Sequence, residues 1–252
     1  MAIPRRIVQT HRSSEIGAHH RETWRSHHPD FEYLFFDDDG CRAFIRRHLP
    51  ALSPTYDRLP LPVQKADLFR YAVIHQLGGV YADVDTACRA PLHSYVDLER
   101  DHLVIGVEMT PDEHPGGIES YGRSYCFPVQ YLQWTFAAPA GHPALGRVLQ
   151  RIAAFVHDTP DRALRAWSDA SPKFTLEMTG PIMFTQAIRE LLAQPRVPAV
   201  TILHRHVWGA IPPEFRSAEI LRSVKVAHLF AGSWKAPPMR NDAVMTPPAT
   251  RA

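Results

Sequence analysis

The sequence predicts an α/β protein in which helices cover a mostly parallel central sheet. Short apolar runs alternate with segments of helical period, which is the pattern of this fold class. A length of 252 residues with 45% hydrophobic side chains suffices for one elaborated domain. The predicted strands cover residues 3–9, 31–36, 80–83, 103–108, 132–137, 200–204 and 224–230. The predicted helices cover residues 40–48, 63–77, 143–157 and 181–193.

The helix over residues 143–157 has the clearest 3.6-residue period. Its apolar side chains recur on one side, at Leu145, Val148, Leu149, Ile152 and Phe155. Residues 109–130 are rich in glycine, proline and polar side chains and are interpreted as a long loop, a feature that is often functional. From residue 236 the composition turns to proline, alanine and threonine, which is typical of disorder. We therefore expect one domain over residues 1–235 and a disordered tail over residues 236–252.

The overall charge excludes some classes of partner. A formal net charge of +2 without a basic stripe gives no indication of nucleic-acid binding. The cysteines Cys41, Cys88 and Cys126 form no CxxC pair, so we expect reduced thiols rather than a disulfide framework or a cysteine zinc site. No run of about 18 apolar residues is present. The expected location is cytoplasmic, with at most peripheral contact at the inner membrane face.

The helix over residues 63–77 carries the first candidate site residues. It begins near Pro62, because proline is tolerated in the first helical turn, and it ends at the pair Gly78-Gly79. Asp67 and Arg70 lie on one stripe beside the core-facing stripe, so an acid and a guanidinium project together. Taken alone, this pair is a helical salt bridge. The residues that follow give it a possible further role.

An acidic D-x-D motif follows the two glycines. In an alternating strand, Tyr81, Asp83 and Asp85 point to one side, and the apolar residues between them point to the other. Two carboxylates on one face repel each other unless a cation lies between them. Ligands bind at the carboxyl ends of strands in such sheets, so the pair predicts Mg²⁺ or Mn²⁺ bridging to phosphate oxygens. The rival acidic run over residues 37–39 is better explained as the N-cap and first-turn acids of a helix.

These motifs resemble those of a known family. The runs over residues 65–71, 78–81 and 83–86 resemble the DXD sugar-transferase region of glycosyltransferase family 32, in particular its initiating outer-chain α-1,6-mannosyltransferases. Further matching segments occur in the same order at residues 3–10, 24, 28–30, 106–108, 133–135, 141–143, 179–181 and 232–235. The resemblance therefore spans about residues 3–235.

The resemblance implies a GT-A fold, a nucleotide-sugar donor and transfer with retention at the anomeric carbon. By the same carry-over, Asp67 and Arg70 contact the donor sugar and diphosphate, and Tyr81 lies against the nucleoside. Asp83 binds ribose or sugar hydroxyls and shares the cation, while Asp85 ligates it directly.

Other donor-binding candidates follow from the same resemblance. Gln9 and Thr10 approach the base from the end of the first strand. The remaining candidates are Gly180, Ser233, Trp234 and Lys235.

Of the fifteen histidines, His228 is the one interpreted as a metal ligand, together with Asp83 and Asp85. It precedes a Gly-Ser-Trp-Lys run, and residues 228–235 are expected to close over donor and metal. The pairs at residues 19–20 and 27–28 are interpreted as solvated. His142 is interpreted as a capping or packing residue. His204 and His206 could bind zinc only with further ligands, and the sequence shows none near them.

The expected function is therefore metal-dependent transfer of a hexose, with GDP-mannose favoured, to a hydroxyl of a glycan or glycolipid. Glu108 and Glu177 are weaker candidates for contact with sugar hydroxyls, and no general base stands out. Three alternatives remain open. They are a UDP-hexose donor, an aspartate-based phosphohydrolase, and a non-catalytic sugar- or nucleotide-binding module.

Overall fold

The computed structural model describes residues 2–100 and 102–230 and is an α/β protein built on one central sheet. Within these residues the sheet has seven strands, in the order β2-β1-β3-β7-β5-β6 with β8 paired to β5. Their bounds are β1 Arg6–Thr10, β2 Glu32–Phe36, β3 Gly79–Ala82, β5 Leu103–Met109, β6 Gln130–Tyr131, β7 Thr135–Ala138 and β8 Val200–Leu203. A second, two-stranded sheet pairs β4 (Thr86–Cys88) with β9 (Val226–His228).

The central sheet is mostly parallel, as predicted. β1, β2, β3, β5 and β8 run in one direction, and β6 and β7 run in the other. The reversal follows from the connection after β5. There the chain turns back through residues 110–129 and continues directly into β6 and β7, without the crossover that parallel pairing needs.

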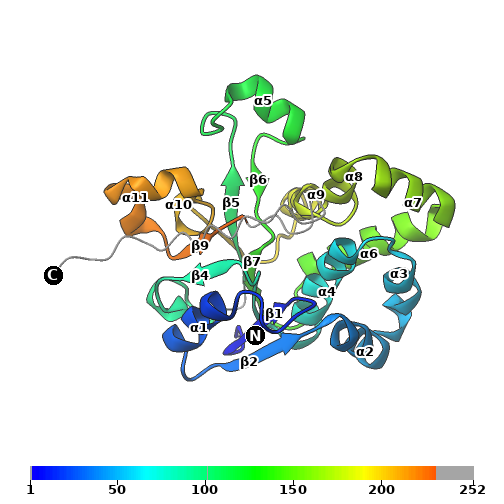
Figure 1. Ribbon diagram of the computed structural model, residues 1–252, viewed down its shortest axis with the longest axis horizontal. Coiled ribbons are helices and arrows are strands. Elements are labelled where there is room, and N and C mark those ends of the chain that lie inside the picture. The colour runs from blue at the N-terminus through cyan, green and yellow to red at the C-terminus, as the bar shows by residue number, and fades with distance from the viewer. Residues whose placement is uncertain (1, 101, 231–252) are drawn as a thin grey trace.

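Helices cover both faces of the sheet unequally (Figure 1). One face carries α2 (Asp38–His48), α3 (Ser53–Arg58), α4 (Pro62–Leu77), α6 (Pro143–Asp158), α7 (Asp161–Ala170), α8 (Pro172–Met178) and α9 (Pro181–Leu192). The other face carries α1 (Ala18–His27), the β4–β9 sheet, α10 (Arg205–Trp208) and α11 (Ala218–Ser223). A hydrophobic core lies on each face. The larger is centred on α4, and the smaller contains Trp24, Trp134 and Trp208.

α4 is more deeply buried than an amphipathic stripe predicts. Every residue from 67 to 74 is buried, because the helix lies between the sheet and the outer helices. It ends at Gly78, whose φ of 67° a glycine adopts without strain. A Cβ there would lie 2.7 Å from the backbone nitrogen of Ala140. The turn from α4 into β3 therefore depends on this glycine.

Several predictions of secondary structure were wrong. The predicted strand at residues 224–230 is shorter and pairs with β4 outside the central sheet. Helices α1, α3, α7, α8, α10 and α11 were not predicted. α1 shows the reason, because its only buried side chains are Arg21 and Trp24, which leaves almost no apolar period to detect.

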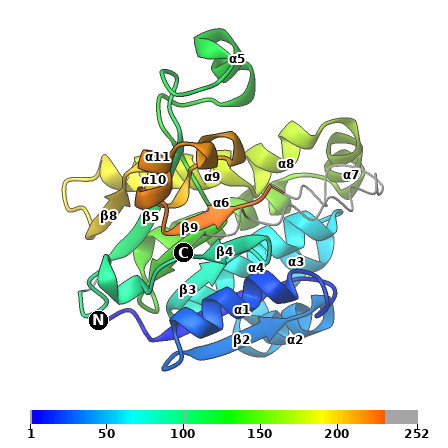
Figure 2. The ribbon, with the colours of Figure 1, turned by 60° about the vertical axis from the view of Figure 1, so that its left-hand side comes forward.

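Residues 110–129 form a projection that we call the β5–β6 arm. It leaves the sheet after β5, carries α5 (Gly117–Ser124) and returns to β6, and it stands away from the body in both views (Figures 1 and 2). The arm replaces the predicted structureless loop over residues 109–130. The predicted tail over residues 236–252 lies outside the described residues, within which no helix is long and apolar enough to cross a membrane.

Candidate active site

The acidic motif lies in a tight turn at the carboxyl end of β3. The backbone oxygen of Asp83 accepts hydrogen bonds from Thr86 N (3.1 Å), Thr86 Oγ1 (2.5 Å) and Gln9 Nε2 (3.1 Å). The nitrogen of Asp83 donates to the oxygen of Trp134 at 2.8 Å. The predicted strand alternation thus ends at Ala82, and the turn itself brings the two carboxylates together.

Asp83, Asp85 and His228 form a candidate metal site. Each offers one ligating atom, and these atoms all lie within 4.8 Å of one another. β9 places the histidine there, because His228 pairs with Thr86 in the β4–β9 sheet. Its Nε2 lies 3.2 Å from Asp85 Oδ1, and its ring stacks on Trp134 with centroids 4.5 Å apart. The predicted metal ligands are therefore neighbours in the fold.

The chemistry of these groups fits a divalent cation. Burial raises the pKa of Asp83, Arg70 opposes that rise, and the neighbouring Asp85 carboxylate raises the pKa further. His228 Nδ1 is buried and has no hydrogen-bond partner among the described residues. The Asp83 and Asp85 side chains remain 24% and 23% exposed, so a ligand can reach them. Carboxylate oxygens with one imidazole nitrogen suit Mn²⁺ or Mg²⁺ better than a soft metal.

Arg70 links the acidic turn to α4. Its guanidinium lies 3.3 Å from Asp83 Oδ1 and 3.2 Å from Asp67 Oδ1, and its Nη1 donates to the oxygen of Gln133 at 3.2 Å. Its side chain is only 7% exposed. The predicted Asp67–Arg70 pair is thus present, but as part of a buried network rather than a surface salt bridge.

Asp67 is enclosed on all sides. Its Oδ1 accepts from Gln133 Nε2 at 3.0 Å, and its Oδ2 accepts from Thr179 Oγ1 at 2.9 Å. Burial raises its pKa to about 6, against the opposing effects of Arg70 and these two donors. At 2% exposure Asp67 presents almost no surface, and its contact with a donor sugar stays a prediction. In this structure Asp67 holds Arg70 in place.

Tyr81 is enclosed by protein side chains in the same way. Its ring is fully buried, stacks on Phe136 with centroids 5.7 Å apart, and lies 4.9 Å from the Arg70 guanidinium carbon. Its hydroxyl donates to Asp83 Oδ1 at 2.8 Å. Neither ring face is open in this structure, and the contact with a nucleoside stays a prediction. Tyr81 orients the Asp83 carboxylate.

The residues at the end of β1 are likewise occupied by the protein. Gln9 is fully buried. Its Nε2 donates to the backbone oxygen of Asp83, and its Oε1 accepts from the Tyr33 hydroxyl at 2.8 Å. Both polar atoms of its amide thus have protein partners, and the approach of Gln9 to a base stays a prediction. Thr10 Oγ1 donates to the backbone oxygen of Phe36 at 2.8 Å. Thr10 also lines a cavity of about 210 Å³ together with Lys65.

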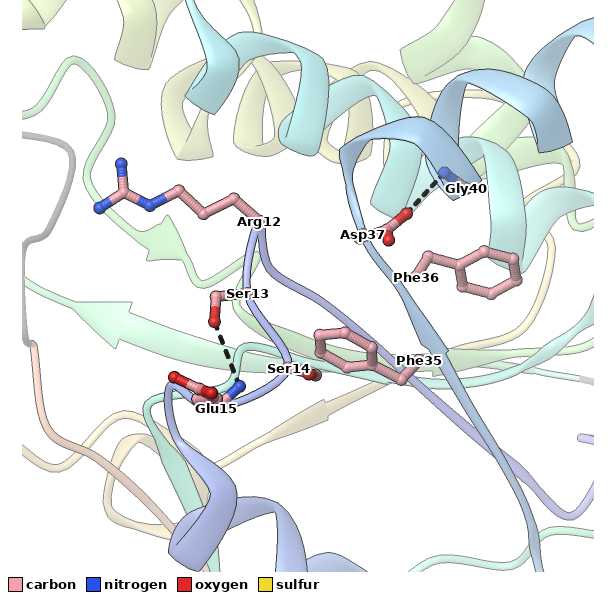
Figure 3. Close-up of a pocket in the computed structure, with 8 residues that line it drawn as sticks. All are labelled: Arg12, Ser13, Ser14, Glu15, Phe35, Phe36, Asp37 and Gly40. Atoms are coloured by element: carbon pink, nitrogen blue, oxygen red, sulfur yellow. Dashed lines mark hydrogen bonds between the residues drawn. The ribbon is translucent and has the colours of Figure 1, made fainter.

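A larger cavity of about 480 Å³ lies at the carboxyl ends of β1 and β2 (Figure 3). It is lined by Arg12, Ser13, Ser14, Glu15, Phe35, Phe36, Asp37 and Gly40. The loop after β1 forms one side of it, and the start of α2 forms the other. Gly17, in the same loop, packs against the oxygen of Val84 in the acidic turn. Sequence reasoning missed this cavity, because its polar loop has no pattern beyond its place after a strand.

The remaining donor-binding candidates are less informative. Gly180 is buried at the start of α9, where a Cβ would lie 2.8 Å from Leu176 Cα, so tight packing accounts for it. Ser233, Trp234 and Lys235 lie outside the described residues. Glu177 is exposed on α8, 3.7 Å from Lys173. Glu108 lies at the carboxyl end of β5 and accepts a hydrogen bond from Tyr125.

The other polar residues interpreted from sequence are mostly structural. Asp37 caps α2 by accepting from Gly40 N at 2.7 Å, and His142 caps α6 by accepting from Ala144 N at 3.3 Å, as predicted. His204 caps α10. His28 was wrongly interpreted as solvated. It is 2% exposed, and it bridges the oxygen of Trp24 (2.9 Å) and the nitrogen of Leu92 (2.8 Å).

The fold is of the GT-A type, a class found in glycosyltransferase domains. Among solved structures, the ligand-free glycosyltransferase domain of the YGT toxin has a similar fold. Its TM-score is 0.52 at 8% identity, over 80% of each chain. This similarity concerns the fold alone.

Sequence comparison finds a family model that matches part of the chain. Residues 17–103 match the family model described as "Glycosyltransferase sugar-binding region containing DXD motif". The matched segment contains the D-x-D motif of Asp83 and Asp85.

Two relatives from fission yeast are similar to most of this chain. The chain is similar to an initiation-specific α-1,6-mannosyltransferase of Schizosaccharomyces pombe, at 33% identity over 75% of this chain and 49% of the relative. It is also similar to inositol phosphoceramide mannosyltransferase 3 of the same yeast, at 28% identity over 84% of this chain and 51% of the relative. The chain thus spans about half the length of these relatives.

Proposed function

We propose that this chain transfers a mannosyl group from GDP-mannose to a hydroxyl of a glycan or glycolipid, with retention at the anomeric carbon and with Mn²⁺ or Mg²⁺. The convergence of Asp83, Asp85 and His228 beside the buried Arg70 is the observation that carries the proposal. The relatives support the sugar, because both are named mannosyltransferases, although their names differ in the acceptor.

In this proposal the chain's residues bind the donor in an extended row. The nucleoside occupies the cavity at the ends of β1 and β2, and the diphosphate reaches Asp83 and Asp85 past the close contact of Gly17 with Val84. When bound, a divalent cation would supply the positive charge that stabilises the leaving diphosphate. Asp83, Asp85 and His228 would hold it. Tyr81 and Arg70 keep Asp83 in the ligating orientation.

The reaction replaces one bond to the anomeric carbon with another. The acceptor oxygen forms a bond to that carbon as the bond to the diphosphate oxygen breaks, and GDP departs. The acceptor proton passes to the leaving phosphate oxygen, so no separate general base is needed. The fixed dipoles of the acidic turn require little rearrangement during the step, which is the basis of electrostatic catalysis.

A direct test is GDP release that depends on donor sugar, metal and acceptor. We expect GDP-mannose with Mn²⁺ to give mannosyl transfer, EDTA to abolish it, and Asp85→Asn to lower turnover on the order of 10²–10³-fold while the protein remains folded. Asp38→Asn is the matched control, because Asp38 is a first-turn acid of α2, and it should retain near wild-type turnover.

The other outcomes identify the alternatives. Transfer from a UDP-hexose in place of GDP-mannose would change the donor assignment. Release of inorganic phosphate would indicate a phosphohydrolase, and nucleotide binding without turnover would indicate a non-catalytic module. Full transfer activity in EDTA would contradict the metal role of Asp85.

A further inference from the structure

The β5–β6 arm rises from the sheet edge that carries the acidic turn. β3 and β5 run in the same direction, so Asp83 after β3 and Glu108 near the end of β5 lie at the same edge. The returning strand continues from β6 through residues 132–134 to Trp134, which stacks on His228. The foot of the arm is therefore joined directly to the candidate metal site.

The order of the strands leaves the part of the sheet next to β5 and β6 open to the acceptor. Along the sheet, the larger cavity lies at β2 and β1, the acidic turn lies at β3, and the arm lies at β5 and β6. If the donor extends from that cavity to the acidic turn, as in the proposed function, its sugar ends beyond β3. An acceptor must then approach from the side of β5 and the arm.

The foot of the arm carries groups that suit a sugar. Tyr125 donates to Glu108 Oε1 at 3.3 Å, and both side chains are half-buried. Burial and the Glu108 carboxylate raise the pKa of Tyr125 well above its ordinary value, so it remains a neutral donor. Its ring packs on Tyr121 with centroids 4.8 Å apart and on His114 at 6.1 Å. Carboxylate, phenol and aromatic groups together can bind the hydroxyls and apolar faces of a sugar ring.

The charge of the arm favours a neutral acceptor. Residues 110–129 contain Asp112, Glu113 and Glu119 but only one strong cation, Arg123. The nearby Arg205 is 2% exposed and is already paired with Glu214 through two hydrogen bonds of 2.6 and 2.9 Å. The carboxylates Glu108, Asp112, Glu113 and Glu119 outnumber Arg123 and Arg189, the latter with its guanidinium 5.1 Å from the Phe127 ring. An acceptor with a phosphate close to its reacting hydroxyl would therefore meet net repulsion here.

We propose that Glu108 and Tyr125, at the foot of the β5–β6 arm, bind hydroxyl groups of a neutral sugar acceptor. The proposal rests on the proposed transferase function. In it, Glu108 accepts from one acceptor hydroxyl, while the Tyr125 hydroxyl, which donates its one proton to Glu108, accepts from another. Both are acceptor-binding residues, since they lie on the arm side of the acidic turn. Neither belongs to the donor or metal site.

The experiment separates acceptor binding from donor chemistry. GDP-mannose with Mn²⁺ is supplied with methyl α-mannoside, and both mannosyl transfer and hydrolysis of the donor by water are measured. We expect Glu108→Gln and Tyr125→Phe each to raise the KM for methyl α-mannoside by about tenfold, the effect of losing a hydrogen bond to a charged or buried partner. The rate of donor hydrolysis should stay within about twofold of wild type.

Glu119→Gln is the matched control, because Glu119 is an exposed carboxylate on α5 of the same arm and should leave the KM unchanged. Thermal unfolding of all three variants checks that they are folded. An unchanged KM in folded Glu108→Gln and Tyr125→Phe would overturn the proposal, and so would transfer to inositol phosphate in preference to methyl α-mannoside. Absence of both transfer and hydrolysis in the wild type would instead contradict the proposed function.

Discussion

At the scale of single residues, the site is defined by side chains that hold other side chains. Arg70 is shared between Asp67 and Asp83, while Gln133 and Thr179 complete the hydrogen bonding of Asp67. A buried charge without such partners would cost several kcal/mol. An incomplete network would therefore destabilise the folded protein. The partly exposed Asp83 can thus touch a ligand, while the buried Asp67 and Arg70 hold its carboxylate in position.

Tyr81 provides the sharpest residue-level prediction. If it orients Asp83, Tyr81→Phe keeps the buried ring and removes only the 2.8 Å hydrogen bond. We expect the affinity for GDP in EDTA to stay within about twofold of wild type and the affinity for Mn²⁺ in the presence of GDP to fall by about 5–10-fold, the usual effect of one such bond. Isothermal titration measures both.

The opposite pattern would support the role first expected for Tyr81. A weaker affinity for GDP without metal, together with unchanged Mn²⁺ affinity, would mean that the phenol contacts the nucleoside. Tyr33→Phe is a useful comparison, since it removes a tyrosine hydroxyl bonded to Gln9 at a similar 2.8 Å. That bond is one residue further from the carboxylates, so the loss of Mn²⁺ affinity should be smaller.

At the scale of elements, the connection from α4 to β3 sets the position of the acidic turn. The helix brings Asp67 and Arg70, the strand brings Tyr81, and Gly78 and Gly79 join them with φ values of 67° and 112°. Any shift of this connection would change the register of Ile7 with Val80 in the neighbouring strand pair. The two glycines therefore act on the site without touching it.

Gly78→Ala tests this dependence. The new Cβ would lie 2.7 Å from Ala140 N and 2.8 Å from Pro4 Cδ, in a left-handed backbone region that alanine disfavours. We expect the free energy of unfolding to fall by about 1–3 kcal/mol, measured by urea denaturation. Gly122→Ala is the control. A Cβ at Gly122 has nothing within 4 Å, and alanine favours the helix by up to about 1 kcal/mol. Equal stability of Gly78→Ala and wild type would show that the connection can adjust.

At the scale of the whole molecule, the site joins segments that are far apart in the chain. The acidic turn follows β3, His228 ends β9, and Trp134 precedes β7. A ligand that spans these segments must therefore stabilise the folded chain as a unit. This gives a prediction that needs no acceptor and no turnover.

We expect GDP and Mn²⁺ together to raise the free energy of unfolding by about 2.7 kcal/mol at 100 times the Kd. Since the cation reduces the repulsion between carboxylates and diphosphate, the combined effect should exceed the sum of the separate effects. Differential scanning calorimetry with GDP, Mn²⁺, both or neither checks the expectation. An additive pair of shifts would mean that nucleotide and metal bind independently, which the proposed donor site does not allow.

The sequence predicts the outline of this site because its strongest signals are local. Helical period and the Gly-Gly stop place Asp67 and Arg70 on one helix, with the D-x-D one short strand further on. The exact partners are not local. Gln133 and Thr179 reach Asp67 from loops after β6 and α8, and a single amide or hydroxyl in a loop has no period that marks its target. Burial of Tyr81 and Gln9 was missed for the same reason, since solvent exposure depends on layers packed from other parts of the chain.

The β5–β6 arm has one further consequence, which concerns how such a protein can diversify. Because β5 and β6 are antiparallel neighbours, the two ends of the arm remain one strand spacing apart, roughly 5 Å, whatever lies between them. Residues 110–129 can therefore lengthen, shorten or be exchanged without displacing a strand. The donor half, by contrast, is tied together by the network around Asp67, where every change affects a neighbour. Insertions and deletions can accumulate in the arm while the donor half stays fixed, so one catalytic scaffold can give rise to descendants that serve different acceptors.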